Sequence, residues 1–103
     1  FSAKAIINFL CQNINRKTSI SEFANDLGVS ESTLMKKTKH FTGHTVQNLH
    51  ELLKIERAKI LLRQKQLPVA QIAERLGFYN QSYFCRVFKK YAGASPLHWS
   101  PPA

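Results

Sequence analysis

The sequence predicts an all-α protein of about seven helices, in which two helix-turn-helix subdomains are joined by a long linker helix. Apolar residues recur at helical spacing along most of the chain, and no segment shows sustained strand alternation bounded by hairpin signals. The chain also contains an internal duplication, because residues 20–43 are echoed by residues 69–93. Two similar segments of this length imply two copies of one structural unit.

The duplication is aligned through Gly28 and Gly77. With one extra residue in the second turn, the matched pairs are Ile20/Val69, Phe23/Ile72, Ala24/Ala73, Leu27/Leu76, Ser32/Ser82, Leu34/Phe84, Lys36/Arg86, Lys39/Lys89, Phe41/Tyr91 and Gly43/Gly93. Each copy reads as a short helix, a glycine-containing turn and a second, more basic helix. This arrangement is the one that presents a recognition helix to the major groove of DNA.

The size and charge of the chain favour a compact binding domain. Its 103 residues make one domain-sized unit, too short for a large substrate cleft plus a separate regulatory module. Fifteen Lys and Arg against six Asp and Glu give a net charge of +9 and a pI near 10.0, which favours nucleic acid or an anionic membrane as partner. Charge alone does not choose between these partners and a generic basic surface.

Cysteine usage and hydropathy indicate a cytoplasmic protein. Cys11 and Cys85 have no ligand partners close in sequence, and the chain has no CxxC motif, which is typical of reduced thiols. The longest apolar runs are far too short to span a bilayer. Because the chain begins at Phe1 without a methionine and ends at Ala103, we expect a fragment of a longer protein.

Apolar spacing, capping residues and glycines predict three helices in the first lobe. An amphipathic helix is expected from Ala3, Ile6, Ile7, Leu10 and Ile14, with Cys11 joining the apolar stripe. The next helix should start at a capping box of Ser19 and Glu22 and end at Gly28, and a third should run from Ser30 to Gly43.

Further signals define the linker and the second copy. Thr45 is expected to cap a helix reaching about Arg63, with apolar residues on more than one face, so that it can serve two cores. Such a helix is roughly 28 Å long, comparable with the ~34 Å repeat of B-form DNA. Pro68 suits a first helical position, and Ser95-Pro96 opens a last helix that the chain barely begins. The expected division is a first lobe over 1–43, a linker helix over 44–65 and a second lobe over 66–103.

In the second copy, the face expected to read bases carries Gln81, Ser82, Cys85 and Arg86. Gln81 can pair with adenine and Arg86 with guanine in bidentate fashion, each contributing about 1 to 3 kcal/mol of discrimination. The same side chains also suit an ordinary solvated helix face.

The corresponding face of the first copy carries Ser32, Met35 and Lys36. Small hydroxyls and a thioether favour contact with a thymine methyl group or water-mediated contact. We therefore expect the first copy to be the poorer reader.

Phosphate contacts are expected from hydroxyl, amide and lysine side chains around the ends of the same two helices. The candidates are Ser30, Thr33, Lys39, Asn80, Lys89 and Lys90. For the lysines, simple solubility is an equal alternative. Among apolar linker positions, Arg57 is expected to bury its stem and pair with Asp26 or Glu22. The aromatic residues expected in the core are Phe78, Phe84, Phe88, Tyr91 and Trp99.

The sequence offers no convincing metal site or catalytic centre. His40 and His44 lie four residues apart with His50 nearby, but Gly43 interrupts the helical register and no cysteine or carboxylate completes a set of zinc ligands. The chain has no glycine-rich phosphate loop and no nucleophile elbow. We expect neither an enzyme nor a bound cofactor.

Residues 72–96, IAERLGFYNQSYFCRVFKKYAGASP, closely resemble the signature of the AraC/XylS family of bacterial transcription regulators. The first copy and the linker segment LLKIERAKILL fit the same family. The resemblance covers roughly residues 4–99. It implies two recognition helices inserted into successive major-groove segments on one face of double-stranded DNA. It also implies the base contacts named above, a preceding effector or dimerisation domain, and contact with RNA polymerase during activation. We expect the isolated domain to be monomeric.

The chain departs from the family pattern at three positions. Lys37 and Thr38 stand where the family usually has an apolar residue and a phenylalanine, and Ser100 stands where it has an arginine. The first recognition helix is therefore expected to be less firmly packed than the second, which keeps Val87 and Phe88.

Two alternatives to a transcription regulator follow from the sequence. A DNA-repair enzyme could use a similar domain to hold DNA, but it would need a cysteine-rich, metal-bound methyl-acceptor segment that Cys11 alone cannot supply. A protein-interaction module could instead use the basic face to bind an acidic partner, and its binding would not depend on DNA sequence.

Overall fold

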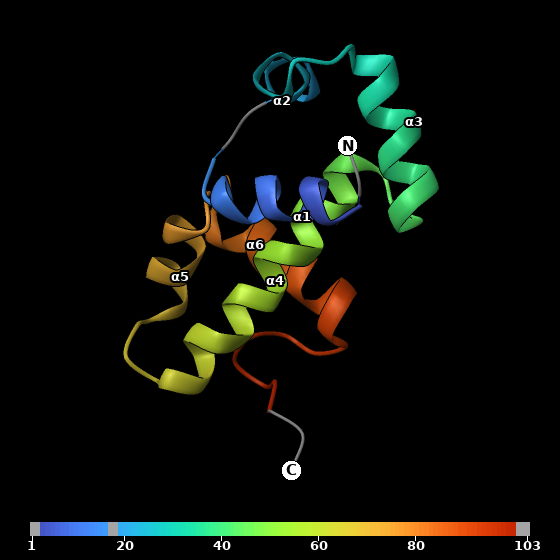
Figure 1. The fold of residues 1–103 in the computed structure, drawn as a ribbon. Helices are drawn as coiled ribbons and strands as arrows, with labels where there is room; N and C mark the ends of the chain where they lie inside the picture. Colours follow the sequence, from blue (N-terminus) through green and yellow to red (C-terminus); the bar gives the residue numbers. More distant parts are fainter. Residues whose placement is uncertain (1–2, 17–18, 101–103) are drawn as a thin grey trace.

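Helices account for nearly all regular structure in the protein. The computed structural model describes residues 3–16 and 19–100, and within these ranges it contains six helices and no strand, which confirms the predicted class. The helices are α1 (Ala3–Gln12), α2 (Ile20–Leu27), α3 (Glu31–Thr42), α4 (Val46–Gln64), α5 (Val69–Arg75) and α6 (Gln81–Ala92). Figure 1 shows α4 running diagonally through the molecule, with α2 and α3 towards one end and α5 towards the other.

The helix starts agree with the capping signals in the sequence. The side chains of Ser19, Ser30, Thr45 and Asn80 each accept a hydrogen bond from a backbone NH of the helix that follows. Pro68 lies immediately before α5 and not at its first helical position, a difference of one residue.

The helix expected after Ser95 consists only of a turn in the described residues. The Ser95 carbonyl accepts hydrogen bonds from the backbone NH of His98, at 3.0 Å, and of Trp99, at 2.8 Å. The Trp99 ring then packs edge-on against Phe88, with 5.9 Å between ring centroids.

Two separate cores lie on either side of α4. The first core is built from Ile6, Leu10, Phe23, Ala24, Leu34, Val46 and Leu49, and the second from Ile55, Ala58, Ile72, Ala73, Leu76, Phe78, Phe84, Val87 and Phe88. The expected aromatic core is confirmed, because Tyr91 and Trp99 are partly buried against the second cluster. Since α4 contributes Val46 and Leu49 to one core and Ile55 and Ala58 to the other, one helix fixes the position of both lobes.

The first core contains a polar side chain where the second has an aromatic ring. Thr38 is fully buried, and its Oγ1 has no hydrogen-bond partner among the described residues. Phe88, at the matching position of the second copy, is also fully buried and makes edge contacts with Phe84 and Trp99. A buried, unpaired hydroxyl is unfavourable, and each recognition helix has one among the described residues, Thr38 in α3 and Tyr91 in α6. At the matched position itself, α3 lacks the aromatic packing that Phe88 gives α6.

Two sequence expectations are wrong. Cys11 is exposed and does not join the apolar stripe of α1, whose buried members are Ile6 and Leu10. Arg57 is exposed as well, and Asp26 instead forms an ion pair with Arg16, with 2.5 Å between Nη1 and Oδ2. Arg16 also lies against α2 at Phe23, with its guanidinium carbon 5.9 Å from the ring centroid.

The lobes also approach each other outside α4. Gly77, in the turn of the second copy, has φ +76° and lies against Asn15, which follows α1 in the first lobe. A Cβ atom at Gly77 would lie 2.3 Å from the Asn15 carbonyl oxygen, whereas one at Gly28, φ +72°, would meet nothing within 4 Å. The two aligned glycines therefore share a backbone conformation but not a neighbour.

We expect Gly77→Ala to destabilise the protein more than Gly28→Ala. Left-handed backbone strain costs about 1 to 2 kcal/mol at either site. At Gly77 the clash with Asn15 adds about 1 to 3 kcal/mol. Urea unfolding of the two variants measures the difference, and equal losses would show that the lobes do not press together at this point.

Candidate nucleic-acid interface

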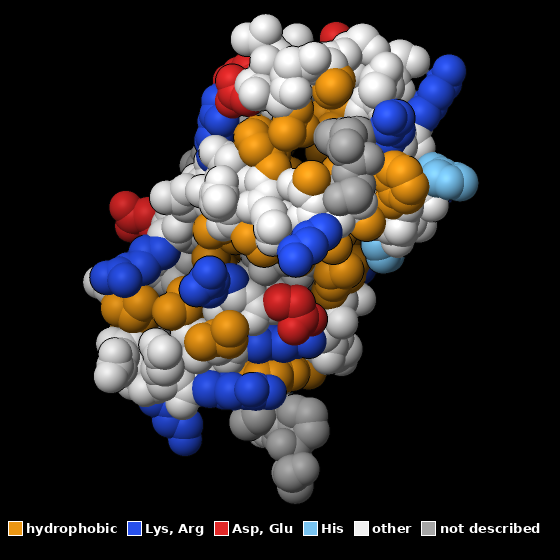
Figure 2. Space-filling model, in the orientation of Figure 1, with side chains coloured by type: hydrophobic (Ala, Val, Ile, Leu, Met, Phe, Trp, Pro, Cys, Tyr) orange, Lys and Arg blue, Asp and Glu red, His pale blue; other side chains and the backbone are white. Residues whose placement is uncertain are grey.

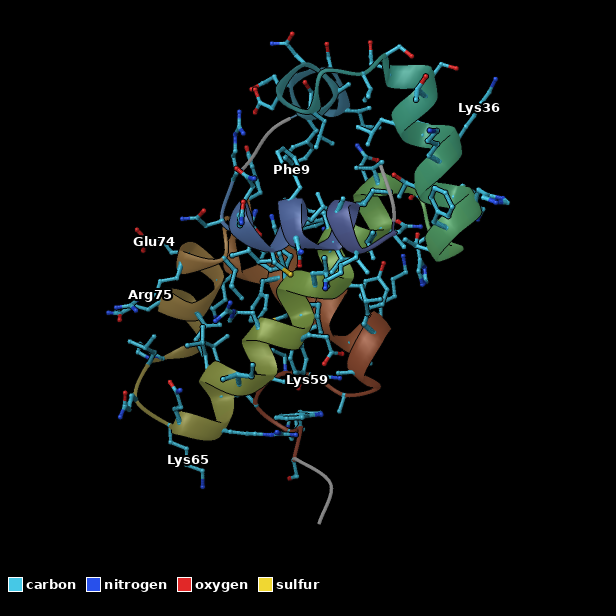
Figure 3. The ribbon with its side chains drawn as sticks, viewed as in Figure 1. Phe9, Lys36, Lys59, Lys65, Glu74 and Arg75 are labelled. Carbon is cyan, nitrogen blue, oxygen red and sulfur yellow. The ribbon has the colours of Figure 1, made fainter. Side chains whose placement is uncertain are left out.

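The outer face of α3 carries the expected base-reading residues of the first copy. Ser32, Met35 and Lys36 are all exposed, with Met35 47% exposed, and Lys39 continues the same row one turn later. Leu34 and Thr38 are the buried residues of this helix. Figure 3 shows Lys36 pointing away from the body of the molecule, so this side chain is accessible to a binding partner.

The outer face of α6 repeats this row. Ser82, Arg86 and Lys89 are exposed, as is Gln81 at the start of the helix. Cys85 differs from its counterpart Met35, because it is half-buried and packs against the second core. The thiol therefore has less reach towards a partner than the thioether of the first copy.

The basic side chains at the far ends of α3 and α6 have partners within the protein. Lys39 Nζ donates to the Gly43 carbonyl at 3.2 Å, and Lys90 Nζ lies 5.1 Å from the centroid of the Tyr91 ring. Positive charge near a helix C-terminus is favourable to the helix itself. Lys89 is exposed on the row shared with Arg86.

The candidate phosphate contacts at the helix starts also act as caps. Ser30 Oγ accepts from Thr33 N at 3.1 Å and donates to Thr33 Oγ1 at 2.8 Å, so its proton is engaged in the free protein. Asn80 Oδ1 accepts from Tyr83 N at 2.7 Å, and its Nδ2 makes no hydrogen bond with the described residues. Asn80 can therefore cap α6 and still donate to an anion.

A groove of about 560 Å³ lies where the two lobes meet. Its lining includes Arg16, Gln47, Asn48, His50, Glu51, Lys54, Gly77, Phe78, Tyr79 and Tyr83. Gln47 also lines a second hollow, of about 390 Å³, together with Met35 and Lys39 of α3. Gln47 of α4 therefore lies between a hollow lined by residues of α3 and the groove that reaches Tyr83 of α6.

A hydrogen bond across this groove was not anticipated from the sequence. The Tyr83 hydroxyl of α6 donates to the Glu51 carboxylate of α4. This bond, followed by desolvation of the phenol, raises the pKa of Tyr83 above its usual value. A sequence pattern could have indicated this polar face of α4, because the linker helix has polar residues at positions 47, 51 and 54, spaced about one turn apart.

His50 connects α4 to the chain that follows α1. Its Nε2 lies 3.0 Å from the Asn13 carbonyl oxygen, and its ring packs edge-on against Phe23, with 5.3 Å between centroids. Burial, followed by the positive charge of Lys54, lowers the pKa of His50. A neutral ring that donates from Nε2 satisfies this site.

The basic side chains do not gather in one patch on the face that Figure 2 shows. Lys and Arg side chains are scattered over that face. Across residues 3–16 and 19–100, no three His, Cys, Asp or Glu side chains come together as a metal site. In the same part of the chain no helix is long and apolar enough to cross a membrane.

The helix-turn-helix domain family matches residues 23–100. The HTH-type transcriptional activator RhaR of Enterobacter sp. (strain 638) is 32% identical over 94 residues, covering 91% of this chain and 33% of that protein. The arabinose operon regulatory protein of Escherichia coli (strain K12) is 36% identical over 91 residues, covering 84% of this chain and 31% of that protein. The chain thus spans about a third of the length of these two relatives. Histidine kinase P4 of Formosa agariphila is 30% identical over 82% of this chain, which covers 6% of that protein.

Solved structures share the fold. The C-terminal domain of AraT, a response regulator from Geobacillus stearothermophilus, has a TM-score of 0.85 at 29% identity, over 92% of this chain and 79% of that one. The DNA-binding domain of AdpA, a global transcriptional factor solved in complex with a target DNA, has a TM-score of 0.85 at 18% identity, over 92% of this chain and 86% of that one. At this identity the likeness to AdpA concerns the fold alone.

The shift at His50 predicts a pH dependence of stability. Because the pKa is lower in the folded state than the value of 6.5 for an unperturbed histidine, the unfolded state binds more protons between the two values. The stability contributed by neutral His50 is therefore complete above pH 6.5 and is lost as the pH falls through the folded-state pKa.

We expect His50→Gln to flatten the decline of the unfolding free energy between about pH 7 and pH 5, since glutamine keeps an NH donor for Asn13 but does not titrate. Urea unfolding at several pH values measures this slope. The exposed His44, changed to Gln, serves as the control for replacing a histidine with glutamine outside the core. A slope unaltered in His50→Gln would show that His50 is not held neutral in the fold.

Proposed function

The chain belongs to the AraC-type family of helix-turn-helix DNA-binding domains of transcription regulators, and from this premise we propose that α3 and α6 enter successive major-groove segments of an operator. The observation that carries the proposal is the repeated row on the outer faces of these helices, which is exposed except at the half-buried Cys85. Ser32, Met35, Lys36 and Lys39 are matched in order by Ser82, Cys85, Arg86 and Lys89. Both rows follow one helical face, so each helix offers an equivalent edge to a groove.

The dimensions of the molecule support simultaneous insertion. The described residues extend 40 Å along their longest axis, and α4, with 19 residues, separates the two recognition helices. One turn of B-form DNA is ~34 Å long, so two lobes on one rod can reach grooves one turn apart. In this proposal residues 1–43 and 66–103 are the reading lobes and residues 44–65 fix their separation.

Each base-reading residue is proposed to have a role that follows from its chemistry. Arg86 and Lys36 donate to guanine, Gln81 pairs with adenine, and the hydroxyls of Ser32 and Ser82 contact whichever base edge lies nearest. Met35 and Cys85 provide apolar contact with a thymine methyl group, and the half-buried Cys85 makes the smaller contribution.

Phosphate contacts are proposed for the helix ends. The residues are Ser30, Thr33, Lys39, Asn80, Lys89 and Lys90. Lysine contacts release counterions, so the affinity of this +9 chain should fall as salt rises. Of the two capping residues, Asn80 is better suited to donate to phosphate, because its amide NH2 makes no hydrogen bond with the described residues whereas the Ser30 proton is bound by Thr33.

The whole protein is proposed to be a bacterial transcription regulator acting in the cytoplasm. The relatives named as transcriptional activators and operon regulators support this proposal, as does the match of this chain to about a third of their length. We propose further that the domain binds DNA as a monomer, contacts RNA polymerase at promoters and catalyses no reaction itself.

Selection of random duplex DNA by the 103-residue chain at physiological salt tests the proposal directly. We expect enrichment of a two-part motif whose centres lie about one helical turn apart. A single enriched half-site would mean that only one lobe reads sequence. Absence of any enrichment would contradict sequence-specific binding and favour a protein partner for the basic surface.

Arg86→Ala should relax base preference at one base pair of the selected motif, because it removes about 1 to 3 kcal/mol of discrimination there. Lys89→Ala should weaken binding to all sequences about equally and reduce the salt slope by about one. Competition binding with single-base variants of the motif at several salt concentrations separates these effects.

Lys65→Ala provides the control for this comparison. Lys65 ends α4 and projects from the end of the molecule away from α3 (Figure 3), so its loss should change neither base preference nor salt slope by a comparable amount. A base profile that is unchanged in Arg86→Ala would show that Arg86 does not read a base.

A further inference from the structure

We propose that Glu51 and Tyr83 position the Arg86 side chain, and that this pair determines how strictly α6 discriminates at the base pair read by Arg86. The inference rests on the proposed function, since it concerns the same recognition helix. Glu51 and Tyr83 do not contact a base themselves in this proposal. Both affect base discrimination by positioning the Arg86 side chain.

The contact that carries the inference joins Tyr83 to Arg86. The two residues are three apart on α6, and the guanidinium carbon of Arg86 lies 5.7 Å from the centroid of the Tyr83 ring. A guanidinium over an aromatic face is attracted by the electron density of the ring. The ring therefore restricts a long side chain that would otherwise sample many rotamers in solvent.

Tyr83 can serve as a platform because it is held at both ends. Its backbone NH is bound by Asn80 Oδ1 at 2.7 Å, and its hydroxyl donates to Glu51. Its ring also lies 6.1 Å, centroid to centroid, from the buried ring of Phe78. The chain of contacts runs from the linker helix through Glu51 and Tyr83 to Arg86.

The position of Glu51 supports this role. Glu51 lines the groove between the two lobes, next to the start of α6, and a carboxylate there repels phosphate and is unfavourable for DNA binding by itself. Its hydrogen bond with Tyr83 accounts for its presence there, because it orders the platform against α4, the helix that also fixes the lobes.

The first copy lacks this arrangement. Thr33 stands at the position that matches Tyr83, and a threonine offers no ring to Lys36, the counterpart of Arg86. An arginine held over a ring can present its planar fork to guanine with little further loss of freedom, whereas Lys36 is a point charge on a flexible stem. We therefore expect discrimination by α6 to exceed discrimination by α3.

The test compares Tyr83→Leu, Tyr83→Phe and Glu51→Gln by competition binding on single-base variants of the selected motif. Tyr83→Leu should lower discrimination at the Arg86 base pair by about two- to fivefold, the effect expected from an exposed cation–ring contact. Preferences at other positions and affinity for random duplex should change little. Tyr83→Phe keeps the ring but loses the bond to Glu51, so its discrimination should fall between that of wild type and that of Tyr83→Leu. Glu51→Gln keeps an acceptor for the Tyr83 hydroxyl and should keep discrimination at this base pair, while the loss of the carboxylate strengthens binding to all DNA about equally.

A double-mutant cycle distinguishes positioning from a general structural role. In an Arg86→Ala background, Tyr83→Leu should have no further effect on the base profile. An undiminished effect in that background, or an equal change at every base position, would overturn the inference. Thermal unfolding of each variant identifies loss of fold, and Tyr83→Phe provides the readout if Tyr83→Leu does not fold.

The cycle also separates this inference from the proposed function. If Arg86→Ala relaxes one base pair but Tyr83→Leu does not, Arg86 reads a base without help from Tyr83, and only the positioning role is wrong. If Arg86→Ala changes nothing, the base contact and the positioning role are both wrong.

Discussion

The rest of the structure depends on α4 being a single rigid helix shared by two cores. Val46 and Leu49 pack into the first core, while Ile55 and Ala58 pack into the second. A helix that buries side chains at both ends cannot bend or rotate without opening one of the two clusters. The separation and relative rotation of α3 and α6 are therefore set by packing within the protein before any DNA is bound.

Contacts outside α4 reinforce this constraint. The Asn15 backbone lies against Gly77, and the Asn13 carbonyl lies within hydrogen-bond distance of His50. The short segment after α1 thus touches both the linker helix and the turn of the second lobe. Preorganisation of this kind lowers the entropy lost on binding, because a rigid two-lobed surface has less freedom to lose than two tethered lobes.

The two copies share an arrangement of helices but differ in side chains at important matched positions. The first copy has Thr38 and Thr33 where the second has Phe88 and Tyr83. Thr38 places an unpaired hydroxyl in the first core, and Thr33 offers no ring to Lys36, whereas Tyr83 lies beside Arg86. The second copy therefore has aromatic packing and an arginine beside a ring where the first copy has two threonines and a lysine.

The sequence by itself determined the local structure. Ser19, Ser30 and Thr45 mark helix starts through hydrogen bonds that close within three residues, so their effect needs no distant partner. Contacts between distant segments were decided only by the tertiary structure. The Arg16–Asp26 ion pair, which replaces the pair expected for Arg57, and the Glu51–Tyr83 bond depend on how helices far apart in sequence are rotated towards each other. That rotation follows from the packing of two whole cores on α4, which no short-range pattern in the chain encodes.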